Sequence, residues 1–499
     1  MVHKVVVLGG GSAGFMAAMA LKFKMPALAV RVIRSKDIGI IGVGEGSTAA
    51  LTDFLHKYME IGLKKFHEVA QPSWKMGLKF IWGPRPYFNY TFGPGLEVRS
   101  DRTLPKANGY YCEHDIEYTD PYSAFMTHDR IFLHNKGAPV MHDTIAYHFE
   151  NEKFVRFLEG YSVALGVEIV EDTVAAVTVD EQGVTGLKLA SGTIETADLY
   201  VDASGFRSEL LGKVLAEPFI DFKSSLFCEC AVVGGWDRNS STEPADQIIK
   251  PYTTCETMDA GWAWQIEHEN RINRGYVYSP AFISDEEAER EFRSKNPRVG
   301  PTRIVRFMSG RYQRGWVKNV VAIGNASGFV EPLEATALGV IAQQSRLLTE
   351  SLHLSDRQPR PTQVDMFNRY HSSIWDAIRG FLGIHYKYNT RLDTPFWQHC
   401  REKTNLAGAE EIVQYFVENG PDAYWGPTLL NNSSDPFTIS GYITMMIGMC
   451  VPFRKTYHPG DEECRLLKVR QKKYKDLALG ALTVRQTLDY IRSPKWSWK

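Results

Sequence analysis

A glycine-rich turn near the start of the chain is the first pattern with an evident chemical use. Gly9-x-Gly11-x-x-Gly14 follows the apolar run 5–8 and precedes a helical stretch, 15–24. In such a turn the first glycine permits the bend, the second lets backbone amides approach a pyrophosphate, and the third lets the helix pack close to the strand. Together with Ser12 and Ala13, these glycines predict a dinucleotide site.

The second strand, expected over residues 29–33, ends on an unusual residue for such a site. An acidic side chain normally holds the adenosine ribose at this place, and Arg34 stands about there. We therefore expect an altered ribose contact and weaker dinucleotide binding.

Two later segments favour FAD over NAD. Residues 199–205 and 320–326 each read as a strand that ends in a turn of small residues. Strands that return so late are typical of an FAD fold interrupted by substrate-domain insertions. They add Asp202, Gly324 and Asn325 to the cofactor-binding candidates, although each segment alone also fits an ordinary sheet strand.

A pair of tryptophans is the second chemical pattern. Trp262 and Trp264 are spaced i, i+2, so on a strand they point to the same side and form a rigid, water-excluding aromatic wall. Such a wall separates two compartments. The alternative is plain packing in the core of a sheet.

Composition limits the class of protein. The chain has 499 residues, of which 44% are apolar and 23% charged, with a formal net charge of −1. These values indicate an ordinary globular protein and give no reason to expect nucleic acid or an anionic membrane as partner. The seven cysteines lack Cys-x-x-Cys spacing, so we expect a reducing, cytoplasmic setting without a disulfide framework or metal site.

Several motifs in order carry a family resemblance. They are Gly9-x-Gly11-x-x-Gly14, Gly42-Val43-Gly44-Glu45-Gly46-Ser47, Lys79 in Leu78-Lys79-Phe80, Trp262-x-Trp264-x-Ile266, residues 329–336, and the C-terminal His385-Tyr386, Thr390-Arg391 and 393–397. Through these residues the chain resembles flavin-dependent halogenases of the tryptophan halogenase type, from Val5 to about Arg401.

The resemblance implies a two-component enzyme. A separate flavin reductase would deliver FADH2, molecular oxygen would form a flavin peroxide, and a bound halide (chloride, bromide or iodide) would be oxidised to hypohalous acid. Lys79 would then activate this oxidant by a hydrogen bond or as a haloamine, and Glu334 would stand near it to orient the oxidant or accept the arene proton. Taken alone, Lys79 fits a solvated lysine and Glu334 a helix-capping residue. Lys75 and Glu331 are the competing side chains.

The remaining site residues also come from the resemblance. The halide would lie at backbone amides of Thr336 and Ala337, at the start of an expected helix over 336–348. Ala337 often corresponds to glycine in the family, which leaves the halide preference open. Gly44, Glu45, Val174 and Leu338 complete the implied FAD site. Ser327 and Gly328 fit either a flavin-lining loop or a plain turn.

The tryptophan pair acquires a purpose from the resemblance, because a wall between flavin and substrate favours halide oxidation over oxygen transfer. The family motif closes with proline, whereas this chain has Glu267. The change restores a backbone donor and predicts a different shape after Ile266.

We expect an α/β fold. An FAD-binding doubly wound, Rossmann-like domain would span 1–350, with an inserted substrate-side sheet at about 221–310, and a mostly helical region, 351–499, would cover the substrate pocket. The resemblance favours a free, small, electron-rich aromatic substrate, an indole or a phenol, and the chain is compatible with a homo-oligomer. The alternatives are an FAD-dependent aromatic monooxygenase and a catalytically silent flavoprotein.

Overall fold

The computed structural model describes residues 1–35, 44–93, 116–141, 145–239, 241–430, 434–454 and 457–498. Gly42 and Val43 of the second glycine motif lie outside these ranges. The chain forms two compact units, each assembled from segments that are distant in sequence. The first unit comprises Met1–Gln71, Phe149–Phe222 and Phe307–Trp375, and the second comprises Pro72–His148, Lys223–Arg306 and Asp376–Lys499. The expected domains 1–350 and 351–499 stay a prediction.

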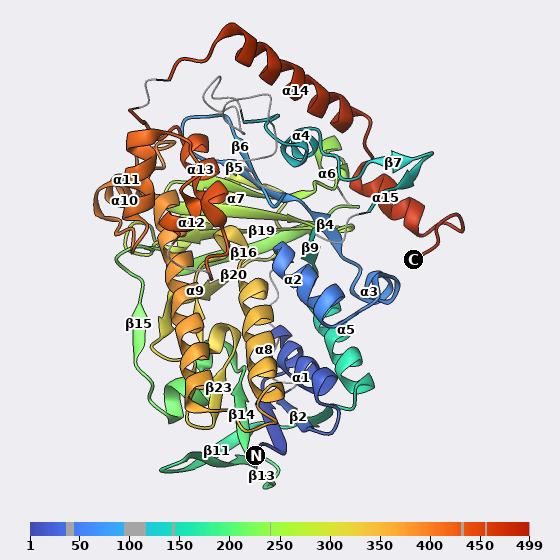
Figure 1. Cartoon of the computed structure of the whole chain (residues 1–499), viewed down its shortest axis with the longest axis vertical. Coiled ribbons are helices and arrows are strands. Elements are labelled where there is room, and N and C mark those ends of the chain that lie inside the picture. Colours follow the sequence, from blue (N-terminus) through green and yellow to red (C-terminus); the bar gives the residue numbers. More distant parts are fainter. Residues whose placement is uncertain are drawn as a thin grey trace. The chain divides into compact units, whose positions relative to one another are not determined.

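A six-stranded sheet forms the centre of the first unit (Figure 1). Its order is β10 (Glu168–Glu171), β2 (Ala29–Arg34), β1 (Lys4–Leu8), β14 (Leu199–Asp202), β23 (Val320–Ala322) and β22 (Trp316–Val317). All neighbours are parallel except β22, which runs antiparallel to β23. The two late strands thus join the same sheet as β1, as the sequence predicts, with β14 next to β1 and β23 next to β14. The continuous apolar run of β1 is buried, as expected of a parallel strand covered on both faces.

Helices pack against this sheet and against one another. They are α1 (Ser12–Lys24), α2 (Ala49–Asp53), α3 (Leu63–Ala70), α5 (Asn151–Ala164) and α8 (Ala337–His353). Helix α1 contacts β1 and β2 and lies beside both α5 and α8 (Figure 1). Its buried alanines, Ala17, Ala18 and Ala20, allow this close approach. Smaller sheets are formed by β11 (Val174–Asp180), β12 (Gly183–Leu189) and β13 (Ile194–Glu195), and by β15 (Phe219–Asp221), β21 (Gly310–Tyr312) and β24 (Gly328–Phe329).

A seven-stranded sheet forms the second unit. Its order is β20 (Arg303–Arg306), β16 (Cys230–Asp237), β19 (Arg271–Tyr278), β18 (Gly261–Glu267), β17 (Tyr252–Met258), β5 (Gly77–Ile81) and β6 (Phe88–Thr91). The expected inserted sheet supplies β16 to β20. Strands β5 and β6 come from much earlier in the chain, and β5 pairs with β17 in parallel. Lys79 therefore belongs to the same sheet as the tryptophan pair.

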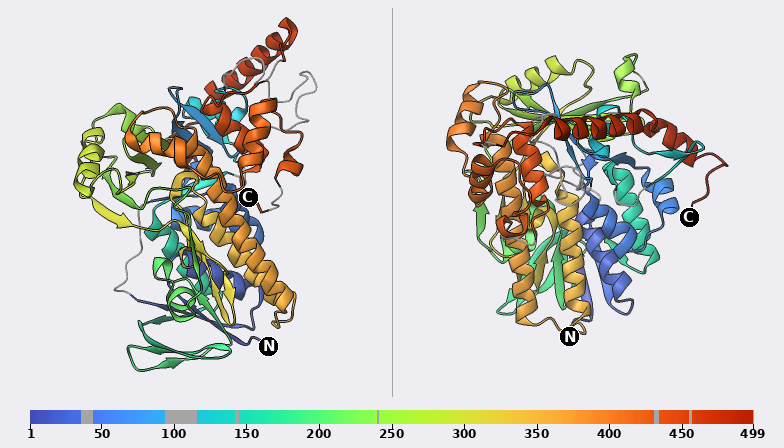
Figure 2. Two further views of the ribbon diagram at one scale, coloured as in Figure 1. Left: turned by 90° about the vertical axis from the view of Figure 1, so that its left-hand side faces the viewer. Right: turned by 45° about the horizontal axis from the view of Figure 1, so that its top comes forward.

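The C-terminal part of the chain is mostly helical, as predicted (Figure 2). Its helices are α9 (Pro361–Lys387), α10 (Pro395–Lys403), α11 (Glu410–Asn419), α12 (Gly426–Leu429), α13 (Thr438–Gly448), α14 (Asp461–Leu479) and α15 (Val484–Ile491). Trp82 anchors this region to the sheet, because its ring packs edge-on against Trp397 at 5.4 Å and its Nε1 donates to the His385 carbonyl at 2.9 Å. None of the helices within the described ranges is both long and apolar enough to cross a membrane.

The remaining elements of the second unit are short. They are α4 (Pro121–Thr127), α6 (Pro244–Gln247), α7 (Asp285–Lys295), β4 (Ser73–Lys75), β7 (His134–Asn135), β8 (Ala138–Pro139) and β9 (Ala146–Phe149). Asp120 caps α4 by accepting from the backbone amides of Tyr122 and Ser123. This cap fixes α4, whose Met126 carbonyl accepts a hydrogen bond from Lys79 on β5.

Candidate functional site

The first glycine turn has the shape that its sequence predicts. Gly9 has a φ of +127°, and a Cβ there would lie 2.2 Å from the Ala203 carbonyl oxygen. A Cβ on Gly14 would lie 1.8 Å from the Gly9 carbonyl oxygen. A Cβ on Gly11 would meet nothing within 4 Å. The backbone at the start of α1 is therefore open at the position where a pyrophosphate is expected to approach, and the residues fit that group.

Two predicted cofactor residues at strand ends already have partners within the protein. Arg34, at the end of β2, forms ion pairs with Glu159 at 2.7 Å and Glu171 at 2.9 Å. At the end of β14, Asp202 accepts hydrogen bonds from the backbone amides of Leu210 and Leu211 at 2.7 and 2.9 Å. Their cofactor contacts stay predictions. The structure adds a local role for each, in cross-strand pairing and in holding the turn after β14.

Glu45, in the second glycine motif, has a carboxyl group that accepts a hydrogen bond and has a raised pKa. The Asn151 side-chain amide donates to its carboxyl group. Burial raises the pKa of Glu45 to about 7. Gly44 before it has a φ of +75°, a conformation that favours glycine. Glu45 is thus able to carry a proton near neutral pH.

The turn after β23 is tied to α1 and α8. A Cβ on Gly324 would lie 3.0 Å from the Ala13 Cβ, so only glycine fits comfortably between these segments. The buried side chain of Gln344 accepts from the Gly324 amide at 2.9 Å and donates to the Ser327 hydroxyl at 2.9 Å. Ser327 therefore belongs to the turn itself. Sequence reasoning missed Gln344, which stands among other polar residues of α8 and carries no distinctive signal.

Glu334 lies just before α8. Pro332–Glu334 form a short 3-10 helix, Ala335 is left-handed with a φ of +54°, and Thr336 is the N-cap residue. The Glu334 side chain is buried, with 1% exposure. The predicted helix is confirmed with a start at Ala337, and the role of Glu334, catalytic or capping, stays a prediction. The first turn of α8 also contains Leu338, which is buried, whereas Val174 begins β11 and is partly buried against the core of the first unit.

Lys79 lies on β5 in a partly buried, aromatic setting. Its Nζ donates to the Tyr252 hydroxyl at 2.9 Å and to the Met126 carbonyl at the end of α4 at 3.3 Å. The same atom lies 4.2 Å from the ring centre of Tyr252 and 4.7 Å from that of Tyr87. Desolvation lowers the pKa of Lys79 to about 8, against opposing contributions from Asp129 and Glu117. Both charge states of the amine are therefore accessible near neutral pH.

Lys75, the competing lysine, has different surroundings. It is fully buried on β4, and its Nζ lies 4.9 Å from the ring centre of Phe92. The assignment of Lys79 rather than Lys75 stays a prediction. Sequence reasoning missed Tyr252 and Asp129, which lie far from Lys79 in sequence. Only the pairing of β5 with β17 brings Tyr252 beside Lys79.

Trp262 and Trp264 lie on one face of β18, with ring centres 6.1 Å apart. Both are buried, and the Trp264 indole lies over Gly275, where a Cβ would come within 2.2 Å of the ring. Across the sheet, Trp264 is in register with Cys255 and Phe80, whereas Lys79 is in register with Thr254 and Gln265. Since neighbouring residues of a strand point to opposite faces, Lys79 and the tryptophan pair lie on opposite faces of this sheet. The partition role stays a prediction, and the rings do not line the Lys79 face.

Glu267, which replaces the family proline, belongs to a buried ion pair. Its carboxylate pairs with the Arg238 guanidinium, and the two side chains are 1% and 0% exposed. Gln265 donates to Glu267 at 2.7 Å, and Lys250 approaches it at 3.9 Å. The strand continues through Glu267, which is in register with Ile272. The residue at the place of the family proline is therefore charged, and the chain supplies its partner, Arg238.

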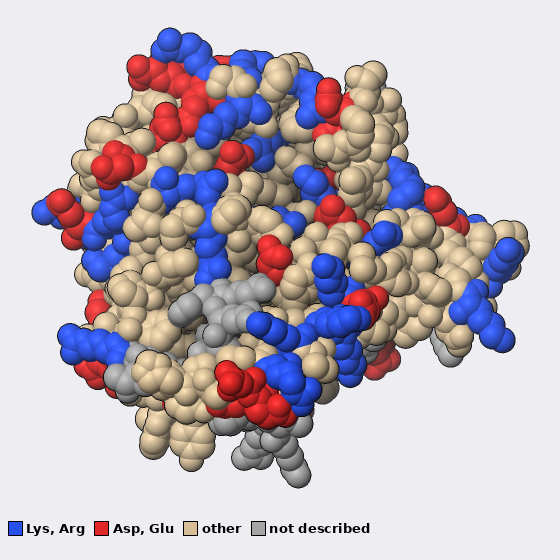
Figure 3. Space-filling model, turned by 90° about the horizontal axis from the view of Figure 1, so that it is seen from above, with Lys and Arg blue, Asp and Glu red and all other residues tan. Residues whose placement is uncertain are grey.

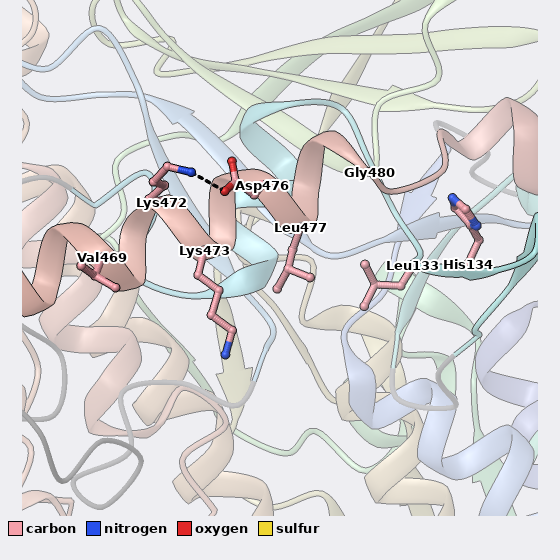
Figure 4. A pocket seen from close by; sticks show the side chains of 8 residues that line it. All are labelled: Leu133, His134, Val469, Lys472, Lys473, Asp476, Leu477 and Gly480. Atoms are coloured by element: carbon pink, nitrogen blue, oxygen red, sulfur yellow. Dashed lines mark hydrogen bonds and ion pairs between the residues drawn. The ribbon is translucent and has the colours of Figure 1, made fainter.

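A separate surface pocket contains none of the candidate site residues (Figure 4). It lies beside α14 and is lined by Leu133, His134, Val469, Lys472, Lys473, Asp476, Leu477 and Gly480. Lys472 is paired with Asp476 across one turn of the helix at 2.8 Å.

Acidic and basic side chains intermingle on the face drawn in Figure 3.

Comparison with known proteins identifies the family of this chain. The family model for tryptophan halogenase matches residues 4–463. The chain is 34% identical to tryptophan 6-halogenase ThaL of Streptomyces albogriseolus over 80% of this chain and 79% of the relative. It is 30% identical to tryptophan 7-halogenase RebH of Lentzea aerocolonigenes, over 83% and 82%. The crystal structure of MibH, a lanthipeptide tryptophan 5-halogenase, superposes with a TM-score of 0.88 at 35% identity, over 99% of this chain and 94% of that one. The chain belongs to the tryptophan halogenase family.

Proposed function

We propose that this protein is an FADH2-dependent halogenase in which Lys79 presents an activated halogen to an electron-rich aromatic of the indole type. The setting of Lys79 carries the proposal: an amine with a pKa of about 8, held by two hydrogen bonds between tyrosine rings. Family membership supports the requirement for reduced flavin from a separate reductase.

The residues of the first unit would hold FAD. The open amides at Gly11 suit its pyrophosphate, and Gly9 and Gly14 shape the turn that presents them. When bound and reduced, FAD supplies with oxygen the oxidising power that converts halide to hypohalous acid. The amides of Thr336 and Ala337, at the start of α8, are the proposed halide contacts, because a helix N-terminus attracts anions.

The hydrogen bonds of Lys79 to described residues use two of the three hydrogens of its ammonium group. The third is the donor that we assign to the oxidant. A hydrogen bond from this donor to hypohalous acid would make the halogen more electrophilic. The neutral amine could instead take the halogen from hypohalous acid to form a haloamine, in which case the O–halogen bond breaks and the hydroxyl group leaves with an amine proton as water. An arginine could not do the second, because its guanidinium stays protonated. Glu334, with its carboxyl group buried, is the proposed acceptor for the proton that the arene loses.

The indole class rests on the relatives, whose names place tryptophan halogenation at three different ring positions. These relatives share the indole ring of tryptophan and differ in the ring position that is halogenated. We therefore propose an indole without naming a position. Free tryptophan, other indoles, phenols and a tryptophan-containing peptide are the informative substrates. We propose free indoles as the first substrates to test, and a cytoplasmic location is part of the same proposal.

Reconstitution tests the function directly. The protein would be supplied with FAD, a flavin reductase, NADH and chloride, bromide or iodide in turn, and products analysed by mass. We expect halide-dependent mass shifts that Lys79→Ala abolishes. Lys213→Ala is the control and should retain them, because the Lys213 side chain is exposed and pairs with Glu209 in the first unit. Halogenation that survives Lys79→Ala would refute the role of this lysine, and oxygen addition without halide would indicate a monooxygenase.

A further inference from the structure

A chain of hydrogen bonds leads away from Lys79. The Tyr252 hydroxyl accepts from the Lys79 Nζ at 2.9 Å and donates to the Asp129 Oδ1 at 2.7 Å. Tyr252 is 3% exposed and begins β17, whereas Asp129 follows α4 with a φ of +52°. Three segments distant in sequence thus converge on the amine.

The direction of these bonds follows from the donors available. An ionised carboxylate only accepts, so the single proton of the Tyr252 hydroxyl must point to Asp129. The lone pairs of the same oxygen then face Lys79, which must be the donor. Asp129 therefore orients the Tyr252 hydroxyl so that its oxygen accepts the hydrogen bond from Lys79.

The second hydrogen bond of Lys79 also orients its amine. The Met126 carbonyl, in the last turn of α4, accepts a second ammonium hydrogen at 3.3 Å. Two acceptors orient the amine, and its third donor has no hydrogen-bond acceptor among the described residues. This third donor is the one that the proposed function assigns to the oxidant.

We propose that Tyr252 and Asp129 are positioning residues of this halogenase, which hold the Lys79 amine so that its remaining donor faces the oxidant. The inference rests on the proposed function and deepens it. Neither residue transfers the halogen. Together they decide where the amine points and how readily it keeps its proton.

The charges around Lys79 are consistent with this role. Asp129 and Glu117 raise its pKa and Lys250 lowers it, so Asp129 opposes both desolvation and a neighbouring cation. Burial, followed by the charge of Asp129, raises the pKa of Tyr252, and burial with the Glu117 contact raises that of Tyr87. Both tyrosines therefore remain protonated, which also keeps them in the form less reactive toward electrophilic halogen.

Tyr252→Phe and Asp129→Asn test the inference in the full-length, reconstituted enzyme. Tyr252→Phe keeps the ring beside Lys79 and removes only the hydroxyl. Tyr278→Phe is the matched control, because Tyr278 lies on β19 of the same sheet and donates to Asp285 at 2.6 Å without contacting a lysine. Each variant is first checked for its thermal midpoint and bound FAD.

For Tyr252→Phe we expect kcat to fall by about ten- to a hundredfold, which corresponds to one hydrogen bond to a charged group, with a much smaller change in the KM for the indole. For Asp129→Asn we expect the limb of the pH profile near 8 to move to lower pH, because the ammonium loses a stabilising charge. This shift has the same direction whether the protonated or the neutral amine is active. A scavenger of free hypohalous acid should trap more oxidant in both variants.

A folded Tyr252→Phe protein with unchanged kcat and an unmoved pH limb would overturn the inference, as would an equal loss in Tyr278→Phe. If Tyr252→Phe fails to fold, the kcat and the pH limb of Asp129→Asn test the inference instead. The proposed function has a separate failure, halogenation that persists in Lys79→Ala, so the two can be told apart.

Discussion

Glu267→Gln should destabilise the second unit far more than its position at the end of a strand suggests. The substitution preserves shape and removes the charge that faces Arg238. Both side chains are buried, and Arg238 also donates to the carbonyls of His268 and Ile248 at 3.0 Å. Those carbonyls cannot neutralise the guanidinium, so the variant leaves a buried cation without its counter-charge.

The magnitude follows from burial. Removing one partner of a buried ion pair costs about 3 to 5 kcal/mol, and we take the lower end because Arg238 keeps its carbonyl acceptors. At about 2 °C per kcal/mol for a unit of this size, the thermal midpoint should fall by about 6 °C. Replacing both Glu267 and Arg238 by methionine should recover most of this loss, because two apolar side chains leave no uncompensated charge.

Differential scanning calorimetry of four proteins checks the reasoning: the wild type, Glu267→Gln, the double methionine variant and Glu269→Gln. Glu269 is the matched control, since it lies two residues away and pairs with Arg492 at 2.6 Å, but Arg492 is 48% exposed. An exposed pair is worth about 0 to 1 kcal/mol, so its loss should lower the midpoint by at most about 2 °C. Equal effects of Glu267→Gln and Glu269→Gln, or a double variant less stable than either, would refute this account.

Three further predictions concern the first unit. The folded apoprotein holds a proton on Glu45 up to about pH 7, against an ordinary value of 4.5, so its stability should fall by about 3 kcal/mol as pH rises across this window. Denaturant titrations of Glu45→Gln should lack this slope, and an unchanged slope would place the titrating group elsewhere. Gly14→Ala should prevent stable folding of the turn, whereas Gly11→Ala should fold normally and bind FAD more weakly in a fluorescence titration; normal folding of Gly14→Ala would contradict the 1.8 Å contact. Asp202→Ala should cost about 2 kcal/mol in chemical unfolding, because it leaves the buried amides after β14 without acceptors, and no loss would show that water replaces them.

Much of the first unit is predictable because its signals are local. The apolar run of β1, the glycines after it and the helix of small residues occur within one short segment, and their periodicity and turn chemistry suffice. The late strands β14 and β23 are recognisable for the same reason. Their placement in the same sheet as β1 then follows from the FAD fold that they indicate.

The second unit is less predictable because its pairing is not local. Nothing in the sequence around Lys79 states that β5 lies beside β17 in parallel, or that the tryptophan rings point to the other face. Register across a sheet depends on partners from distant segments, and a shift of one residue reverses every face. For the same reason Tyr252 and Arg238 carry no sequence signal of their roles.

The parallel pairing of β5 with β17 also has a consequence for how the chain is made. Strand Gly77–Ile81 leaves the ribosome long before Tyr252–Met258, its partner. Until that partner arrives, one edge of β5 offers unpaired amides and carbonyls together with the apolar side chains Leu78 and Phe80, a surface prone to pair with other chains. Nascent chains that stall before residue 252 should therefore depend on chaperones, and fragments that end there should aggregate.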